Sequence, residues 1–134
     1  MILIDSSAFI EFLNRSGSPW DRTVEELIRN DIPCALADVV LTELLRGIRN
    51  NREFHAVRDS LLSFPILSMQ GVASYIHAAQ IYRHCRQKGL TIRSTVDLLV
   101  AQIALDHHAA LLHKDRDFPS IASVVPLKLF PVRQ

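Results

Sequence analysis

The chain has 134 residues, of which 49% are hydrophobic, and a formal net charge of +1. This length suits one domain, residues 1–134, with a real core, and the charge excludes a uniformly basic nucleic-acid coat but not a local cationic rim. No stretch is long enough to span a membrane, and Asp5 interrupts the first apolar run, so we expect no signal peptide and no membrane partner. Cys34 and Cys85 lack metal or redox spacing and are expected to be reduced in the cytoplasm.

The first half of the chain alternates apolar runs with helical patterns. In order, the sequence predicts a strand at 1–4, helices at 8–13 and 19–28, a strand at 34–37, a helix from Asp38 that carries Glu43, a helix at 54–62 and a short strand at 65–67. Ser6 and Ser7 are candidate caps of the first helix, and Asp38 is a candidate cap of the third. The fully apolar strands are typical of a parallel sheet that is covered on both faces.

The second half continues this alternation. It predicts a helix from Val72 that Gly89 ends, a loop at 90–93, a helix that carries Asp97 and is capped by Ser94 or Thr95, a strand at 109–112, and a last strand at 124–130 that Pro126 interrupts. The proline places that last strand at an edge of the sheet. No linker or repeat divides the chain. We therefore expect an α/β fold with a mainly parallel central sheet flanked by helices.

Four acidic residues lie beside or within core-forming segments: Asp5, Glu43, Asp97 and Asp115. Asp5 and Asp115 directly follow predicted strands, at the rim where parallel sheets bind ligands. Alanines four and seven residues after Asp97 would let its helix approach the sheet closely. A buried carboxylate needs a partner, and no buried Lys or Arg is obvious nearby, so a divalent cation is the natural candidate.

Such a cluster suits hydrolysis at phosphorus. Mg²⁺ and Mn²⁺ favour carboxylate oxygens, and a bound cation activates water and stabilises the charge of an in-line attack on phosphate. Each acid taken singly has a plainer explanation as a helix cap, a solvated edge residue or part of a polar turn. Taken together, the four favour a metal-dependent nuclease or phosphatase.

Four segments carry a resemblance to a known family. They are residues 1–7, 41–47, 89–101 and 111–118. Each segment is short, but their order, their spacing and the total length are specific. The chain resembles the PIN-domain ribonucleases and, among them, the VapC-type toxins of type II toxin–antitoxin pairs.

This resemblance implies a PIN-like three-layer α/β/α fold and a set of site residues. The implied catalytic and metal-binding acids are Asp5, Glu43, Asp97 and Asp115, with Asp117 as a further ligand and Ser7 as a hydroxyl near the first acid. It also implies Mg²⁺- or Mn²⁺-dependent cleavage of RNA, inhibition of translation, dimerisation, and neutralisation by a VapB-like antitoxin in a hetero-oligomer. His113 stands where the family often has Thr, which leaves the local hydrogen bonding open.

Cationic and aromatic side chains accompany the acids. Arg46 and Arg116 are the best candidates for contacts to RNA phosphates, although exposed arginines on a solvated surface are ordinary. Phe12, Trp20 and Tyr82 could stack on bases or simply fill the core. The apolar stripe from Val72 to Tyr82 suits either the core or an interface with a second copy or an antitoxin. The six histidines lack zinc-ligand spacing.

Three alternatives stay open. A metal-dependent phosphatase of the haloacid-dehalogenase type would need a second Asp two residues after Asp5, where this chain has Ser7. A catalytically silent PIN-like module that binds RNA or protein would be expected to have lost an acid, whereas all four positions are occupied. A DNA-directed 5′ nuclease of related fold would normally be longer.

Overall fold

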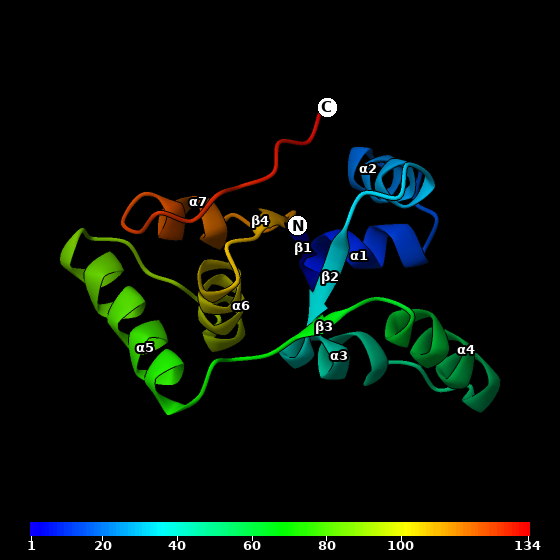
Figure 1. The fold of residues 1–134 in the computed structure, drawn as a ribbon, viewed down its shortest axis with the longest axis horizontal. Helices are drawn as coiled ribbons and strands as arrows, with labels where there is room; N and C mark the ends of the chain where they lie inside the picture. Colours follow the sequence, from blue (N-terminus) through cyan, green and yellow to red (C-terminus); the bar gives the residue numbers. More distant parts are fainter.

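A four-stranded sheet in the order β3-β2-β1-β4 forms the centre of the protein (Figure 1). The strands are β1 (Ile2–Ile4), β2 (Cys34–Ala37), β3 (Ile66–Leu67) and β4 (Ala110–Leu112). The computed structural model describes all residues from Met1 to Gln134. All three strand pairs are parallel, and Ile2 is in register with Cys34 on one side and Ala110 on the other. The predicted parallel sheet is confirmed.

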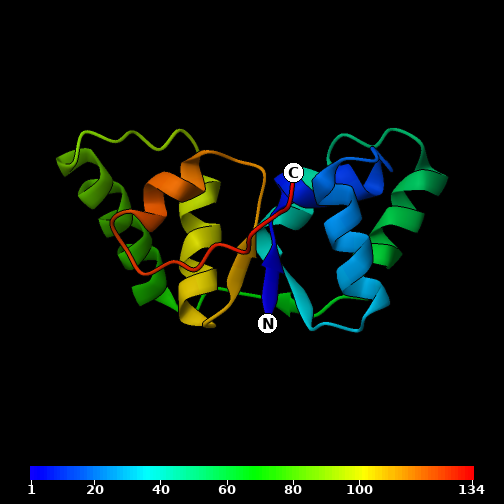
Figure 2. The same ribbon diagram turned by 90° about the horizontal axis from the view of Figure 1, so that it is seen from above.

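Seven helices flank the sheet. They are α1 (Ser6–Leu13), α2 (Pro19–Arg29), α3 (Asp38–Leu45), α4 (Asn51–Leu62), α5 (Val72–Gln87), α6 (Thr95–Asp106) and α7 (Asp117–Ala122). Figure 2 shows α5, α6 and α7 on one side of the strands and α1, α2 and α4 on the other. This is the three-layer α/β/α arrangement that was predicted. None of the helices is long and apolar enough to cross a membrane.

Helix α6 is the central helix of the core. Its residues Val100, Ala101, Ile103 and Ala104 are all completely buried, so the helix is apolar on most sides rather than along one stripe. The two alanines allow close packing, as their spacing after Asp97 predicted. Asp97 lies in the first turn of this helix and is thereby held against the core rather than in solvent.

The helix caps differ in part from the prediction. Asp5, and not Ser6 or Ser7, caps α1: its side chain accepts a hydrogen bond from the Ser7 N–H. Asp5 has the extended backbone that a cap requires because it ends β1. Asp38 was wrongly predicted as a cap; it is already the first residue of α3, where a carboxylate instead favours the helix dipole. Ser94 caps α6 as expected.

The C-terminal segment was predicted wrongly as a strand. Residues 124–130 form only an isolated bridge between Leu129 and Leu111, with hydrogen bonds of 2.8 Å on either side of it. Pro126 and Pro131 lack the N–H groups that a longer ladder needs. Helix α7 was missed, because no helix was predicted after the strand at 109–112. Cys34 and Cys85 are buried and free, as predicted.

Candidate active site

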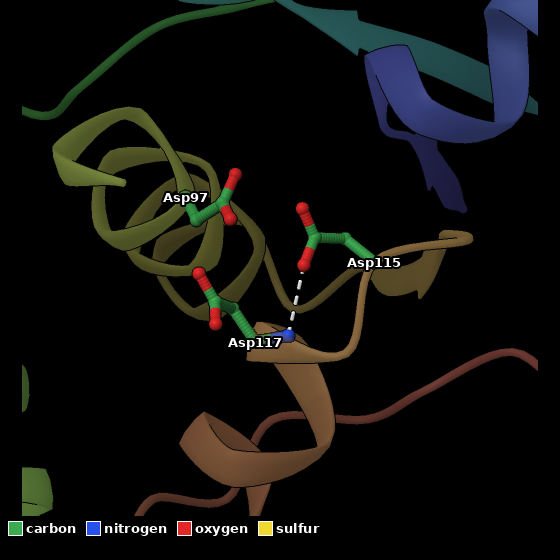
Figure 3. A group of neighbouring side chains, drawn as sticks. All are labelled: Asp97, Asp115 and Asp117. Atoms are coloured by element: carbon green, nitrogen blue, oxygen red, sulfur yellow. Dashed lines mark hydrogen bonds between the residues drawn. The ribbon is translucent and has the colours of Figure 1, made fainter. Parts of the chain in front are cut away.

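Three carboxylates meet where the loop after β4 passes the start of α6. Oxygens of Asp97, Asp115 and Asp117 lie within 4.8 Å of one another (Figure 3). Asp97 comes from the first turn of α6, Asp115 from the loop, and Asp117 from the first residue of α7. Asp97 and Asp117 are each only 7% exposed. The structure therefore brings together three of the predicted acids, including Asp117, which was expected as a further ligand.

Backbone hydrogen bonds hold this group in place. A side-chain oxygen of Asp115 accepts from the Asp117 N–H at 2.9 Å, the bond drawn in Figure 3. A side-chain oxygen of Asp117 accepts from the Arg93 N–H at 3.1 Å, which ties the α5–α6 loop to the start of α7. Main-chain groups thus fix the carboxylates of Asp115 and Asp117, while Asp97 is held by its place in the first turn of α6.

Asp5 lies at the end of β1 and is 2% exposed. Its Oδ2 accepts from the Ser7 N–H at 3.0 Å and from the Ser7 hydroxyl at 2.6 Å. The same hydroxyl oxygen accepts from the Lys114 N–H at 2.9 Å. Ser7 therefore joins the ends of β1 and β4, in addition to lying beside the first acid as its motif implied.

Glu43 approaches the acids from α3. It is half-buried, and its Oε1 accepts a hydrogen bond of 3.3 Å from the Ser6 hydroxyl. Burial raises the pKa of Glu43, and the nearby charge of Asp5 raises it further. Glu43 and Asp5 are outside the group of three but within its electrostatic reach. Ser6 was considered in the sequence only as a helix cap, and its contact with Glu43 could not be read from its position.

The acids of the site raise one another's pKa values, and none of them is in an ion pair. Burial, followed by the charges of Asp115 and Asp5, raises the pKa of Asp97 to about 8. Burial also raises the pKa of Asp5, despite its bonds to Ser7. The ion pairs of the protein are Arg29–Glu25, Arg58–Asp59 and Lys114–Glu11. None of them neutralises an acid of the cluster.

Two buried oxygens in this region have no hydrogen-bond partner, Oδ1 of Asp5 and Oδ2 of Asp97. Leaving a buried acceptor unsatisfied costs roughly 1–3 kcal/mol, and more when it is charged. The donor set consists only of oxygens, which is the set that Mg²⁺ and Mn²⁺ prefer. The residues present therefore fit a hard divalent cation.

An open cleft of ≈ 410 Å³ gives access to the acids. Its lining includes Asp97, Asp115 and Asp117 together with Arg93, Ser94, Lys114 and Arg116. Arg116, a candidate for contacts to RNA phosphates, thus lines the cleft. Arg46 does not line the cleft: it is the exposed residue that ends α3, and its charge acts on Glu43. Arg93 and Lys114 line the cleft with Arg116.

His113 lies behind the cleft. Its ring packs against Phe118, with the ring centroids 5.3 Å apart, and burial lowers its pKa. Nδ1 of His113 is buried without a partner, and the backbone carbonyl accepts a 2.8 Å hydrogen bond from Nε1 of Trp20. The side chain is not part of the acidic group.

Residues 2–124 match the PIN domain family. Ribonuclease VapC11 of Mycobacterium tuberculosis is 32% identical to the chain over 129 residues, which cover 96% of each protein. The chain belongs to the PIN-domain family and, within it, to the VapC ribonucleases. Ribonuclease VapC17 of the same organism is 28% identical over 127 residues, which cover 92% of this chain and 89% of VapC17.

A solved structure has the same fold. The VapBC2 complex of Rickettsia felis bound to a promoter DNA fragment contains a chain that superimposes with a TM-score of 0.75 at 23% identity. The superposition covers 97% of this PIN domain and 98% of that chain. The α/β/α fold is therefore that of a VapC structure over nearly the whole length.

Proposed function

We propose that this PIN-domain protein is a metal-dependent endoribonuclease toxin that inhibits translation by hydrolysing RNA. The observation that carries the proposal is the group of Asp97, Asp115 and Asp117, whose carboxylate oxygens lie within 4.8 Å of one another while Asp97 and Asp117 are buried. A fold does not gain stability from such a group, because like charges in a low dielectric repel each other. Its retention in a member of the VapC ribonuclease family supports a catalytic use.

The acids have distinct places in this proposal. Asp97, Asp115 and Asp117 would hold Mg²⁺ or Mn²⁺, and Asp5 and Glu43 would complete the catalytic set from β1 and α3. A cation bound there lowers the pKa of water and stabilises the charge that develops on the phosphate. Ser7 keeps Asp5 in one orientation, and Ser6 does the same for Glu43. Neither acid has to reorganise when the substrate arrives.

The cationic side chains at the cleft would guide RNA to this acidic centre. Arg93, Lys114 and Arg116 border the cleft, so that a phosphate approaching the acids passes between positive charges. Arg116 is the proposed phosphate contact on this side. Arg46, near Glu43 on α3, is the proposed contact where the RNA strand leaves the cleft.

Two exposed apolar surfaces support the proposed partners. Helix α5 exposes Val72, Tyr75 and Ile76 by 76%, 52% and 57%, so the predicted stripe is largely outside the core. A straight stripe on one helix can pair with its own copy about a two-fold axis, and we assign it to a homodimer. On the opposite side of the sheet, Ile10 and Leu62 are exposed by 46% and 58%.

The second surface lies beside a groove. Phe12 and Leu13 form its apolar part, and Arg15, Asp21 and Glu25 form its charged part. A groove with an apolar floor and charged edges suits an amphipathic peptide. We assign it to a VapB-like antitoxin, whose binding would neutralise the toxin.

Cleavage of total cellular RNA by the purified protein tests the proposal. We expect discrete products with Mg²⁺, none with EDTA, and none from Asp5→Asn, which keeps an oxygen for the bonds to Ser7 but removes the charge. Asp59→Asn, which changes an exposed acid on α4, is the matched control and should cleave like the wild type. Cleavage that survives both EDTA and Asp5→Asn would contradict the assignment to this cluster.

A further inference from the structure

A second hollow adjoins the acidic cleft on the other side of residues 114–116. It measures ≈ 260 Å³, and its lining includes Trp20, His113 and Phe130 together with Lys114, Asp115 and Arg116. The last three residues also line the acidic cleft. The two sites are therefore separated by one short stretch of chain whose charged side chains border both.

The chemistry of the two neighbouring sites differs. The acidic cleft has no hydrophobic lining residue, whereas this hollow has aromatic walls from Trp20 and Phe130 with the imidazole of His113 beside them. Cationic groups at Lys114 and Arg116 lie at its edge toward the acids. Aromatic walls beside a cationic edge are the combination that binds a base and its phosphate in single-stranded nucleic acid.

The walls are fixed before any ligand binds. Nε1 of Trp20 donates a 2.8 Å hydrogen bond to the carbonyl of His113. Nζ of Lys114 lies 5.1 Å from the centroid of the Trp20 ring and 3.4 Å from Oε1 of Glu11. Because the indole is anchored at its N–H and the ammonium lies over its ring, little side-chain entropy remains to be lost on binding.

The size of the hollow restricts the ligand. Pockets for drug-sized molecules occupy roughly 300–1,000 Å³, so a hollow of ≈ 260 Å³ suits one planar heterocycle. A nucleotide whose base entered here would place its phosphate at Lys114 and Arg116. The next phosphodiester of the same strand would then lie toward Asp115 and the acidic group.

We propose that this hollow, lined by Trp20, His113 and Phe130, is a nucleobase subsite for the nucleotide next to the cleaved bond of a single-stranded RNA. The aromatic walls contact the base, and Lys114 and Arg116 contact its phosphate. The subsite determines which base is accepted beside the cleavage position. This inference rests on the proposed ribonuclease function and adds a specificity determinant to it.

Trp20 makes the test direct because it is the only tryptophan of the chain. The metal-free protein in EDTA is titrated with short homopolymeric single-stranded RNAs, each containing only one type of base. A ribose-phosphate strand that lacks bases is titrated in the same way. Binding is followed by anisotropy of the labelled strand, and occupation of the hollow by Trp20 fluorescence. We expect a saturable change in fluorescence with at least one of the RNAs, and binding without that change for the abasic strand.

Two results would overturn the subsite. One is RNA binding by anisotropy with no change in Trp20 fluorescence, or an equal change with the abasic strand. The other is a change produced by a VapB-like antitoxin but by none of the RNAs, which would make the hollow a protein contact. Either result would refute the subsite without affecting the cleavage assay. Conversely, base binding in EDTA could still be measured if the protein failed to cleave RNA.

A variant separates base recognition from catalysis. Phe130→Leu keeps an apolar side chain but removes the flat wall, while the hydrogen bond from the Phe130 N–H to the Leu111 carbonyl is retained. We expect KM for RNA to rise about tenfold, within the usual range for losing one base-stacking contact, with kcat nearly unchanged and a shifted base preference in mapped cleavage ends. Phe54→Leu on α4 is the matched control. Equal KM and cleavage maps for the two variants would refute the subsite.

Discussion

Helix α6 carries an acid near each end, buried Asp97 and half-buried Asp106, and the two differ in whether their oxygens have partners. At the C-terminal end, Asp106 accepts a 2.6 Å hydrogen bond from the Ser74 hydroxyl and a 2.9 Å hydrogen bond from Nε2 of Gln102. At the N-terminal end, Asp97 has an oxygen without any partner and faces two further carboxylates. The same helix thus holds a satisfied acid and an unsatisfied one.

The comparison shows that partial or full removal of an acid from solvent does not by itself identify a functional site. Asp106 ties α5 to α6 through the buried Ser74 and Gln102, and both of its oxygens are used, as expected of a structural network. Asp97 is kept in a position that destabilises its own charge. Residues that violate a rule of stability without local compensation are the ones to suspect of function.

The largest expected effect is on RNA cleavage, which should depend on the acid at the N-terminal end of α6 and not on the acid at its C-terminal end. Asp97→Asn removes a charge from the proposed cation site and should lower RNA cleavage by at least about a hundredfold, since even loss of a supporting group around a metal costs 10–100-fold. Asp106→Asn leaves the acidic cluster intact and should retain most of the activity. Initial rates of cleavage with Mg²⁺, measured at a temperature where both variants are folded, check this.

Equal losses in the two variants would contradict the comparison, because they would mean that a change at either end of α6 disturbs the whole site. Circular dichroism of both variants is the control that excludes unfolding. A hundredfold loss in Asp106→Asn with normal Asp97→Asn activity would place the catalytic acid at the opposite end of the helix.

The next effect concerns the cation itself. A ligand that binds only the folded state stabilises it by about 2.7 kcal/mol at a hundred times its Kd. Mg²⁺ or Mn²⁺ should therefore raise the Tm of the wild type and of Asp106→Asn, and do little for Asp97→Asn. Differential scanning fluorimetry against metal concentration measures this, with Ca²⁺-free buffer and EDTA as the baseline. An equal rise in all three proteins would indicate that the ion binds elsewhere.

Much of this arrangement could be predicted from the sequence. The apolar runs at 1–4 and 109–112 fixed the expectation of parallel strands, and the acids that follow them, Asp5 and Asp115, lie at the rim where such strands end. The spacing of the alanines after Asp97 also predicted that α6 packs close to the sheet, because small side chains on the inner face of a helix allow tight packing. These features depend on local pattern, which the sequence contains directly.

The rest depends on contacts between distant segments. The link from Ser7 to Lys114 spans 107 positions, and the bond from Trp20 to the His113 carbonyl spans 93. No local pattern indicates such pairs. The segment at 124–130 has a strand-like composition, yet its neighbour Leu111 offers a partner at only one point, and prolines limit the ladder. The base hollow likewise needs α2, the loop after β4 and the C-terminal segment together.

A smaller effect is on the free energy of unfolding, which we expect to change in opposite directions when the acid at either end of α6 is replaced by Asn. In metal-free protein near neutral pH, Asp97→Asn should stabilise the fold by about 1–3 kcal/mol, because one pKa unit corresponds to about 1.4 kcal/mol and the neutral amide avoids the cost of the raised pKa. Asp106→Asn should destabilise by about 1–2 kcal/mol, because its amide group faces a donor that had an acceptor before. Urea denaturation in EDTA measures both. Destabilisation by both variants would mean that the acidic group contributes structural bonds.

The smallest effect is the pH dependence that the raised pKa values impose on the metal-free protein. Asp97 has a folded-state pKa of about 8 against an ordinary value of 3.8, so between these values the folded state binds a proton that the unfolded chain has released. Stability is therefore complete at the low end of this window and is lost as pH rises through about 8. Burial gives Asp5 and Glu43 shifts of the same sign.

We expect the free energy of unfolding in EDTA to fall by about 0.5–1 kcal/mol per pH unit between pH 6 and 8, below the limit of about 1.4 for one fully linked proton. Asp97→Asn should flatten this slope, whereas Asp106→Asn should keep it, since its partners are neutral groups. Urea midpoints at several pH values give the comparison. A slope that is unchanged in Asp97→Asn would show that the proton is held elsewhere, and the contrast between the two ends of α6 would then rest on hydrogen bonding alone.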